Sequence, residues 1–482
     1  MRVAMFASEM VPYIKTGGLA DVIGSLPRVL AEKGVHVDVF IPYYRDIERQ
    51  KLPLKKMQFR FNIRIGSRNF KGTALELTLE DSNVRVYFID NYRLFRQRSD
   101  LYVKDGRDYK DNLTRFIFFC RGALETIKYL STSKKYDVFH MHDWQTAIIG
   151  LYTELSKFLR KDQPIRMYTI HNLAYQGKFN RSQFHLLGIH PSHYDSLHYW
   201  GKFILMKAGI IYSDIITTVS PNYAREIQTE QYGAGLDSLL RENKTKIHGI
   251  LNGVDYCVWN PEIDRYIPSN YSINELNGKQ RCKTALQQHF LLTEDPEIPL
   301  LCVVSRLAWQ KGMDLILRVI PKFLQQDRIQ FVLLGIGDPH LESQFNDLSK
   351  SYPSKTGIAL TYNDHLAHQI EAGADIFLMP SRYEPCGLND KYSLKYGTVP
   401  IAYKTGGLAD SIIDYTTNIN HGTGFLFETY NELHFSSAID TALRIFQSKK
   451  EWRQLMKRGM KQDFSWQNSA DAYFKLYQTK IS

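Results

Sequence analysis

The heptapeptide KTGGLAD at residues 15–21 recurs without a change at residues 404–410. Each copy follows a run of β-forming residues or its exit loop and opens a stretch with helical periodicity. The paired glycines, Gly17 and Gly18 in the first copy, allow the backbone to approach a ligand closely, and free N–H groups at a helix start favour an anion such as a phosphate. A tight strand-to-helix turn without a ligand would use the same residues. The repeat therefore predicts two similar strand-to-helix units, one near each end of the chain.

The same alternation of strand and helix runs through both halves of the chain. Amphipathic stretches at residues 19–33, 112–130, 146–159 and 313–325 predict helices. Short apolar runs typical of strands lie at residues 3–7, 35–41, 84–89, 138–142, 167–171 and 215–219, and again at 300–305, 329–335, 358–362, 376–380 and 399–403. This pattern is typical of parallel sheets covered by helices. It predicts an α/β protein with two Rossmann-like, doubly wound domains, whose ligands lie at the carboxyl ends of the strands.

The change from the first pattern to the second gives the expected domain boundaries. A Gly- and Asn-rich stretch at residues 247–261 separates the two patterns, and we expect the hinge there. The first domain would then span residues 1–250 and the second residues 251–460. The final amphipathic run, within residues 461–482, has no strand after it. It either ends the second domain or, as we expect, forms a C-terminal helix that crosses back to the first.

The composition is that of a globular protein with an excess of positive charge. The 482 residues include 61 Lys or Arg and 50 Asp or Glu, which gives a formal net charge of +11. Because the basic residues occur in short pairs such as Lys55-Lys56, mixed with acids and aromatics, they indicate a solvated surface or a small anionic ligand rather than nucleic acid.

The sequence contains no sign of export or of a membrane span. The N-terminus lacks the long apolar region of a signal peptide, and no stretch approaches the ~20 apolar residues that cross a bilayer. The cysteines lie far apart and form no C-x-x-C pair, so they encode neither a disulfide framework nor a zinc ribbon: Cys120, Cys257, Cys282, Cys302 and Cys386. We expect a reduced, cytoplasmic protein without a membrane partner. A plastid location is the alternative if a transit peptide is missing from this chain.

Three common ligand signatures are weak or absent. The stretch from Gly335 to Pro339 begins like a dinucleotide fingerprint but lacks the third glycine and has a proline at the helix entry. No phosphate loop of the type G-x-x-x-x-G-K-[ST] occurs. His140 and His142 share one face of a strand, but a single strand supplies too few ligands for a metal. Polar groups that contact a substrate at a strand end are the favoured interpretation, and we expect neither a metal nor a cofactor.

The strongest chemical pattern lies in the second half. Arg306 and Lys311 come just after a buried strand and before a helix, and Glu384 follows another strand in the same way. Two cations neutralise a leaving diphosphate without a metal, and the helix start after Glu384 adds backbone donors for the same charge. A surface cation pair and a carboxylate at a helix start are the alternative interpretation of these residues.

The order of these motifs resembles that of the bacterial glycogen synthases and plant starch synthases. The matching motifs are KTGGLAD at 15–21, HMHDW at 140–144, TIHNLAYQG at 169–177, VSPNYARE at 219–226, LNGVD at 251–255, SRL at 305–307, QKG at 310–312, GIGDP at 335–339, EPCGL at 384–388, KYGT at 395–398 and KTGGLAD at 404–410. The resemblance implies a retaining glucosyltransferase of the GT-B type, with two Rossmann-like domains that face a deep interdomain cleft.

The family moves glucose from a sugar nucleotide, usually ADP-glucose, to the non-reducing end of an α-1,4-glucan such as glycogen or starch, and needs no metal. The resemblance implies that the first domain lies on the acceptor side and the second holds the nucleotide sugar. The partners expected are therefore ADP-glucose and an α-1,4-glucan. UDP-glucose as the donor is the alternative within the same fold.

The resemblance also assigns roles to individual residues. Lys15 and the backbone of Gly17 and Gly18 would hold the donor diphosphate, and Arg306 and Lys311 would neutralise the leaving ADP. Glu384 would lie beside the glucosyl ring and stabilise positive charge at the anomeric carbon, and His171 would contact the glucosyl hydroxyls. The remaining matches line the donor and acceptor site: Asp21, Tyr102, Asp143, Asn172, Asn252, Tyr362, Cys386, Gly387 and Leu388. Among these, Tyr362 would pack on the adenine.

Retention of configuration implies one of two mechanisms. A double displacement needs a second carboxylate on the opposite ring face. The wider superfamily has an acid eight residues after the first, where this chain has Tyr392. We therefore expect departure of ADP and attack of the acceptor 4-OH on the same face, through a transition state that resembles an oxocarbenium ion.

The chain departs from the family pattern at Asp390, where the family usually has Gln. This places a carboxylate in the first turn of the helix expected to face the diphosphate. The like charge should weaken donor binding unless Asp390 points away or pairs with Lys391. A glucan- or nucleotide-binding protein with weakened turnover is therefore a second hypothesis. Gln145, where many members have His, is a milder change.

Overall fold

A computed structural model of the chain describes residues 1–80, 82–104, 106–131, 135–161 and 163–479. The chain forms two compact units. The first consists of residues 1–219, 224–253 and 466–482, and the second of residues 220–223 and 254–465. The crossing at residues 253–254 lies inside the Gly- and Asn-rich stretch that separates the two sequence patterns.

The first unit contains a nine-stranded sheet. Its strands, in spatial order, are β14 (Ile247–Gly249), β13 (Ile215–Thr218), β9 (Ile165–Ile170), β8 (Val138–His142), β1 (Arg2–Phe6), β2 (His36–Pro42), β5 (Val84–Asp90), β4 (Arg68–Thr78) and β3 (Lys55–Ile65). Neighbours from β14 to β5 pair in parallel, whereas β4 and β3 add an antiparallel hairpin. All six strands expected in the first half are confirmed, and β14 and the hairpin are additions to them.

The helices of the first unit include two that match expected stretches closely. These are α1 (Gly18–Glu32) and α3 (Asn112–Leu130). The helix expected over residues 146–159 is instead broken into α4 (Asp143–Thr146), α5 (Ile148–Leu155) and α6 (Lys157–Lys161). The other helical elements and short strands of this unit are α2 (Arg45–Arg49), η1 (Tyr92–Arg96), β6 (Val103–Lys104), β7 (Arg107–Asp108), β10 (Lys178–Asn180), η2 (Arg181–Leu187), η3 (Pro191–His193), α7 (Tyr194–Leu197), β11 (His198–Tyr199), β12 (Lys202–Ile204), α8 (Leu205–Ile211), α10 (Asp237–Glu242), η4 (Lys244–Lys246) and α19 (Trp466–Gln478). Helix α9 (Pro221–Glu226) begins in the second unit and ends in the first.

The second unit contains a six-stranded parallel sheet. Its strands, in spatial order, are β17 (Thr356–Ala359), β16 (Gln330–Leu334), β15 (Leu300–Val304), β18 (Ile376–Met379), β19 (Val399–Tyr403) and β20 (Phe425–Phe427). Its helical elements are α11 (Asn277–His289), η5 (Trp309–Lys311), α12 (Met313–Gln325), α13 (Pro339–Ser351), α14 (Asp364–Gly373), α15 (Asn389–Tyr396), α16 (Gly406–Ser411), α17 (Glu432–Gln447) and α18 (Lys449–Met460). The five strands expected here are present, and β20 is an addition.

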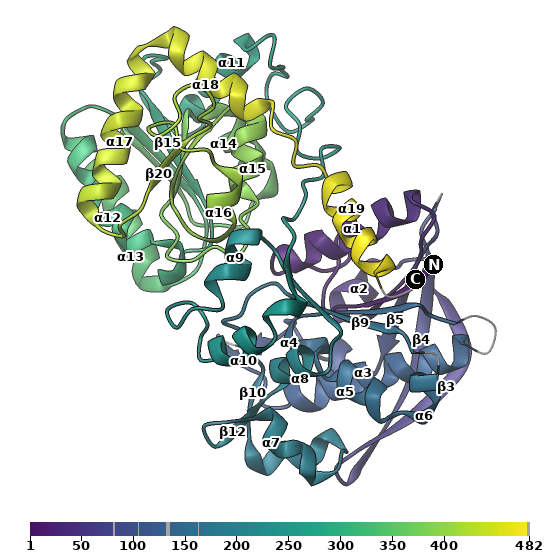
Figure 1. Cartoon of the computed structure of the whole chain (residues 1–482). Coiled ribbons are helices and arrows are strands. Elements are labelled where there is room, and N and C mark those ends of the chain that lie inside the picture. Colours follow the sequence, from purple (N-terminus) through teal and green to yellow (C-terminus); the bar gives the residue numbers. More distant parts are fainter. Residues whose placement is uncertain (81, 105, 132–134, 162, 480–482) are drawn as a thin grey trace. The chain divides into compact units, whose positions relative to one another are not determined.

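Both faces of this second sheet are buried, as the continuous apolar strands require. Alternate residues of β15 point to opposite faces. Leu301 and Val303 pack with α12, α13 and α17, whereas Leu300 and Cys302 pack with α11 and α14. Figure 1 shows these helices on the two sides of the sheet. The unit is therefore doubly wound, and its loops at the carboxyl ends of the strands are free to carry polar residues.

Helix α19 completes the first unit although it is the last helix of the chain. It packs beside α1 (Figure 1), and Lys33 pairs with Asp471 on it at 2.7 Å. The hydroxyl of Tyr477 lies 2.8 Å from Nδ1 of His140 on β8, and both side chains are fully buried. The C-terminal segment is thus joined to the centre of the nine-stranded sheet.

Among the described residues, no helix is both long and apolar enough to cross a membrane.

Tyr477→Phe removes the hydroxyl that contacts His140. We expect the free energy of unfolding to fall by about 1–3 kcal/mol, because the buried imidazole nitrogen loses its partner. Urea unfolding checks this. The matched control is Tyr168→Phe, since Tyr168 on β9 is also fully buried but its hydroxyl has no hydrogen-bond partner among the described residues. Equal losses in the two variants would contradict a stabilising Tyr477–His140 bond.

Candidate active site

The first KTGGLAD copy forms an exposed loop that leads from β1 into α1. Gly17 faces open space, since a Cβ built on it meets no atom within 4 Å. Lys15 is exposed and pairs with Asp21 in the first turn of α1 at 2.8 Å. The loop thus presents an ammonium group and glycine backbone beside a helix start, which is an arrangement suited to an anion.

A carboxylate outside the matched motifs, that of Glu9, holds this loop in place. Glu9, only 4% exposed, accepts hydrogen bonds from the backbone N–H and the hydroxyl of Thr16, at 2.5 and 2.7 Å, and from Gly17 N–H at 3.3 Å. It also accepts from the hydroxyl of Tyr102 at 2.7 Å. Tyr102 therefore supports the loop through Glu9. The signal available was a carboxylate directly after a buried strand.

A second polar group lies at the neighbouring strand ends. Asp143 follows β8, and His171 follows β9, which pairs with β8. The backbone N–H of His171 donates to Oδ1 of Asp143 at 2.8 Å, and the His171 ring contacts Nδ1 of His142 through Nε2 at 2.9 Å. Asp143 adopts a positive φ of 56°, a conformation uncommon outside glycine. The start of α4 is thus shaped to direct this carboxylate toward the His171 backbone.

Burial sets the charge of these groups. It lowers the pKa of His171 to about 3 and that of His140 to about 3, so both rings are neutral at physiological pH. Burial raises the pKa of Asp143 to about 7, against the backbone N–H groups of His171 and Asn172, which lower it. The nearby Glu9 charge adds to the increase. His171 can therefore act as a neutral hydrogen-bonding group, but it supplies no positive charge.

Two further expected residues lie in the same unit. Asn172 follows His171, and its side-chain oxygen accepts from the N–H of Ala174 at 3.0 Å. Asn252 is 4% exposed, and its Oδ1 has no hydrogen-bond partner among the described residues.

In the second unit, two loops carry the expected cations and the carboxylate. Arg306 follows β15 and is exposed, with no ion pair among the described residues. Lys311 donates from Nζ to Oε2 of Glu384 at 2.5 Å, and the hydroxyl of Ser381 donates to the same oxygen at 3.0 Å. Because β15 pairs with β18, these loops leave the same edge of the sheet. The structure thus brings Lys311 and Glu384 together.

Backbone contacts fix the distance between these two loops. The N–H of Arg382 donates to the carbonyl of Gln310 at 2.9 Å, and the amide of Gln310 donates to the carbonyl of Tyr383 at 3.2 Å. The Arg382 guanidinium pairs with Asp314 through two nitrogens, at 2.7 and 2.8 Å. A bidentate pair of this kind is geometrically specific. Lys311 therefore approaches Glu384 from a rigid position.

The second KTGGLAD copy differs from the first in its surroundings. Gly406 and Gly407 are buried, and a Cβ on either would lie within 2 Å of a carbonyl oxygen, that of Glu384 or that of Cys386. Gly407 N–H donates to the Glu384 carbonyl at 2.9 Å. The second copy therefore fits the alternative interpretation, a tight strand-to-helix turn without a ligand, and its glycines permit close packing against the Glu384 loop.

The remaining expected residues divide between buried and exposed. Cys386 is buried, Gly387 has a positive φ of 69°, and Leu388 precedes α15. Tyr362 is 74% exposed, so its ring face is accessible to a ligand. Asp390 is fully buried and pairs with Lys391, with 3.3 Å between Oδ2 and Nζ. Because Lys391 balances its charge, the departure from the family pattern at Asp390 does not oppose the binding of an anionic donor.

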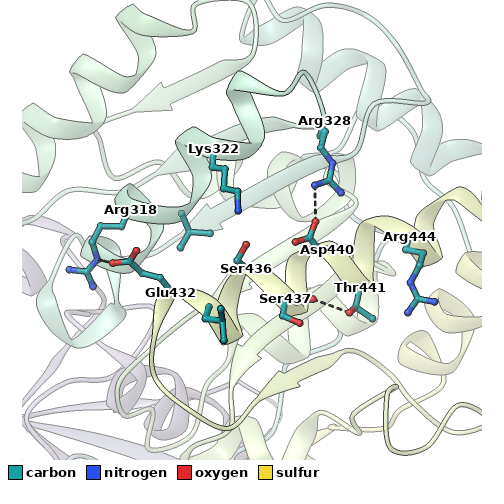
Figure 2. A pocket seen from close by; sticks show the side chains of 11 residues that line it. Arg318, Lys322, Arg328, Glu432, Ser436, Ser437, Asp440, Thr441 and Arg444 are labelled. Atoms are coloured by element: carbon teal, nitrogen blue, oxygen red, sulfur yellow. Dashed lines mark hydrogen bonds and ion pairs between the residues drawn. The ribbon is translucent and has the colours of Figure 1, made fainter.

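A cavity of about 970 Å³ in the second unit, lined by residues of α12 and α17 and by Arg328, contains none of these residues (Figure 2). Two of its cations already have partners: Arg318 pairs with Glu432 at 2.8 Å, and Arg328 with Asp440 at 2.7 Å. Among the described residues, no group of three or more His, Cys, Asp and Glu side chains is placed to hold a metal ion.

Comparison with known proteins connects these motifs to one family. Residues 2–242 match the family described as "Starch synthase catalytic domain", and residues 286–458 match "Glycosyl transferases group 1". The chain is 42% identical to a glycogen synthase of Thioalkalivibrio sulfidiphilus over 496 residues, with 100% of both chains covered. It is 41% identical to a glycogen synthase of Rhodopirellula baltica, with 100% of this chain and 98% of that one covered.

A solved structure agrees with these sequence matches. The catalytic domain of starch synthase IV from Arabidopsis thaliana, bound to ADP and acarbose, has a TM-score of 0.89 and 33% sequence identity, over 99% of this chain and 98% of that one. Both sequence and fold thus agree over the whole length. The chain belongs to the family of glycogen synthases and starch synthases, which makes it a glucosyltransferase with the GT-B fold.

Proposed function

We propose that this protein transfers glucose from ADP-glucose to the non-reducing end of an α-1,4-glucan, with retention of anomeric configuration. The observation that carries the proposal is the Lys311–Glu384 pair at 2.5 Å, on motifs shared with the family and on the same sheet edge as the exposed Arg306. The related starch synthase bound to ADP and acarbose supports this choice of donor and acceptor.

The cations account for the leaving group. Lys311 carries three N–H donors, so it can hold Glu384 and a phosphate oxygen at once. Arg306 presents a planar guanidinium that suits a second phosphate oxygen. Arg306 and Lys311 thus stabilise the negative charge that develops on ADP as the glycosidic bond breaks. In the first unit, the family resemblance assigns Lys15 and the backbone of Gly17 and Gly18 to a diphosphate, and the Gly17 N–H already donates to Glu9.

The carboxylate of Glu384 acts at the sugar. It stabilises positive charge at the anomeric carbon, while neutral His171 orients the glucosyl hydroxyls. Tyr392, at the place of a second acid in the wider superfamily, stacks on Trp259 with 3.9 Å between ring centroids. The Tyr392 ring therefore packs against Trp259 and supplies no carboxylate at this position. This supports departure of ADP and attack of the acceptor 4-OH on one face of the ring, without a covalent glucosyl-enzyme.

Two alternatives to this function are a binding protein with weakened turnover and a synthase that uses UDP-glucose. The second hypothesis, a binding protein with weakened turnover, rests on the negative charge of Asp390, and the pairing of Asp390 with Lys391 weakens that basis. The ratio of kcat/KM for ADP-glucose to that for UDP-glucose decides between the two donors. The reaction would take place in the cytoplasm, in keeping with five free cysteines.

Glu384→Gln should lower kcat with ADP-glucose and a glycogen primer at least about 100-fold, because a neutral amide stabilises a developing positive charge poorly. Glucose incorporation at saturating donor measures this. The matched control is Glu432→Gln on α17, which also breaks an ion pair of the second unit but lies in the α12–α17 cavity (Figure 2) and should keep full activity. Normal turnover in Glu384→Gln would remove this carboxylate from the mechanism.

Side-by-side kinetics should give a higher kcat/KM for ADP-glucose than for UDP-glucose. A higher kcat/KM for UDP-glucose would replace the proposed donor and leave the reaction type unchanged.

Tyr362→Ala should lower kcat/KM for ADP-glucose about tenfold, since stacking of a base on an aromatic ring contributes about 1–3 kcal/mol. Tyr92→Ala is the control, since Tyr92 is an exposed tyrosine of the first unit.

A further inference from the structure

Helix α15 begins with two adjacent charges that are both fully buried. Asp390 and Lys391 each have 0% exposure and pair at 3.3 Å. The Asp390 carboxylate lies directly beneath the Glu384 motif, because a Cβ built on Gly387 would come within 2.5 Å of its Oδ1. The Ser411 hydroxyl of α16 donates to its Oδ2. A negative charge is thus fixed behind the backbone of Gly387.

Lys391 spans the short distance between this carboxylate and the loop above it. Its Nζ donates to the carbonyl of Gly387 at 2.5 Å and to that of Cys386 at 3.2 Å. The ammonium group therefore has three oxygen partners, one of them charged, and lies between the Asp390 carboxylate and the loop carbonyls.

The groups around the pair indicate that it is ionised. Burial opposes a charge on Lys391, yet the Asp390 carboxylate, with further contributions from Cys386 and Glu384, raises the pKa of Lys391 above its usual value. Two other carboxyl groups lie nearby. Glu384 belongs to the loop itself and is paired with Lys311, and burial raises the pKa of Glu371 on α14 to about 8, so it is protonated at neutral pH. Asp390 is then the buried carboxylate behind the loop, and Lys391 is its counter-ion.

We propose that Lys391 is a positioning residue whose task is to neutralise Asp390, so that the Glu384 loop can accept an anionic diphosphate despite the carboxylate behind it. The inference rests on the proposed function, because it takes the donor diphosphate to contact this loop. It concerns the diphosphate alone and therefore applies to ADP and UDP alike.

Loss of Lys391 and loss of Asp390 should have different effects on nucleotide affinity and on stability. Without Lys391, a buried carboxylate either repels the diphosphate or takes up a proton, depending on the pH. Without Asp390, a buried ammonium group costs stability but repels no anion. Removal of both leaves a neutral interior, which proteins tolerate better than half of a buried ion pair.

The test compares Lys391→Met, Asp390→Gln and the double variant by calorimetric titration with ADP and with UDP, each beside the natural protein at the same pH. At about pH 8.5 we expect Lys391→Met to bind the preferred nucleotide about tenfold more weakly, and at about pH 6 this difference should shrink, because burial without a counter-ion disfavours the charged form of a carboxyl group. Asp390→Gln should stay within about twofold of the natural protein at both pH values, with a lower thermal midpoint. The double variant should recover both affinity and midpoint.

The control is Lys283→Met. Lys283 also forms a buried ion pair, with Asp375 at 2.7 Å, and also donates to two carbonyls, those of Pro296 and Ile298. It contacts no part of the Glu384 loop, so its loss should lower the thermal midpoint without a pH-dependent loss of nucleotide affinity.

Unchanged affinity in Lys391→Met at the higher pH would overturn the proposal. A double variant that binds as weakly as Lys391→Met would also overturn it, and this arm remains decisive if the single variant does not fold. The test also distinguishes a wrong donor from a wrong role of Lys391. If the natural protein prefers UDP, the same pH-dependent loss of affinity should appear with UDP instead of ADP. If the natural protein bound neither nucleotide, both proposals would fail.

Discussion

The candidate site of the second unit depends on a close approach between two pieces of backbone. Gly406 and Gly407 lie so near the carbonyls of Glu384 and Cys386 that no side chain fits between them. This contact sets where the Glu384 loop lies, and the hydrogen bonds of Arg382 and Gln310 then set where Lys311 meets it. The two loops that carry the carboxylate and the ammonium group are thus held together by backbone packing and by the Gln310 amide, so their side chains start from fixed positions.

The two copies of one heptapeptide illustrate what sequence can and cannot tell. Their glycines predict strand-to-helix turns, and both turns are present. Whether those glycines face solvent or another loop depends on the neighbouring strand. After β1 the turn is held from below by Glu9 and remains open, whereas after β19 the loop following β18 covers the turn. Identical heptapeptides therefore have different surroundings, because the elements beside them differ.

The parallel strands were predictable because each is a continuous apolar run, and the motif residues were predictable because they follow those runs. The β3–β4 hairpin was not predicted, although Phe61, Ile63 and Ile65 alternate with exposed residues in the pattern of a half-buried strand. The short α4 was missed because Asp143 starts it with a positive φ. The partners of Glu9, Thr16 and Tyr102, are separated from it in sequence. Lys391 could be named as a partner of Asp390, but spacing alone does not show that both side chains turn inward.

The position of α19 has a consequence for the order in which the protein is made. The nine-stranded sheet holds the neutral His140 at its centre, and the hydroxyl that satisfies this ring belongs to Tyr477. A ribosome has therefore released the whole second unit before the first unit receives its last helix. The second unit can fold from a nearly continuous stretch of nascent chain, while the first must wait, nearly complete, for a segment synthesised some two hundred residues later. The unit that begins the chain thus receives its last helix only after the whole of the second unit has been synthesised.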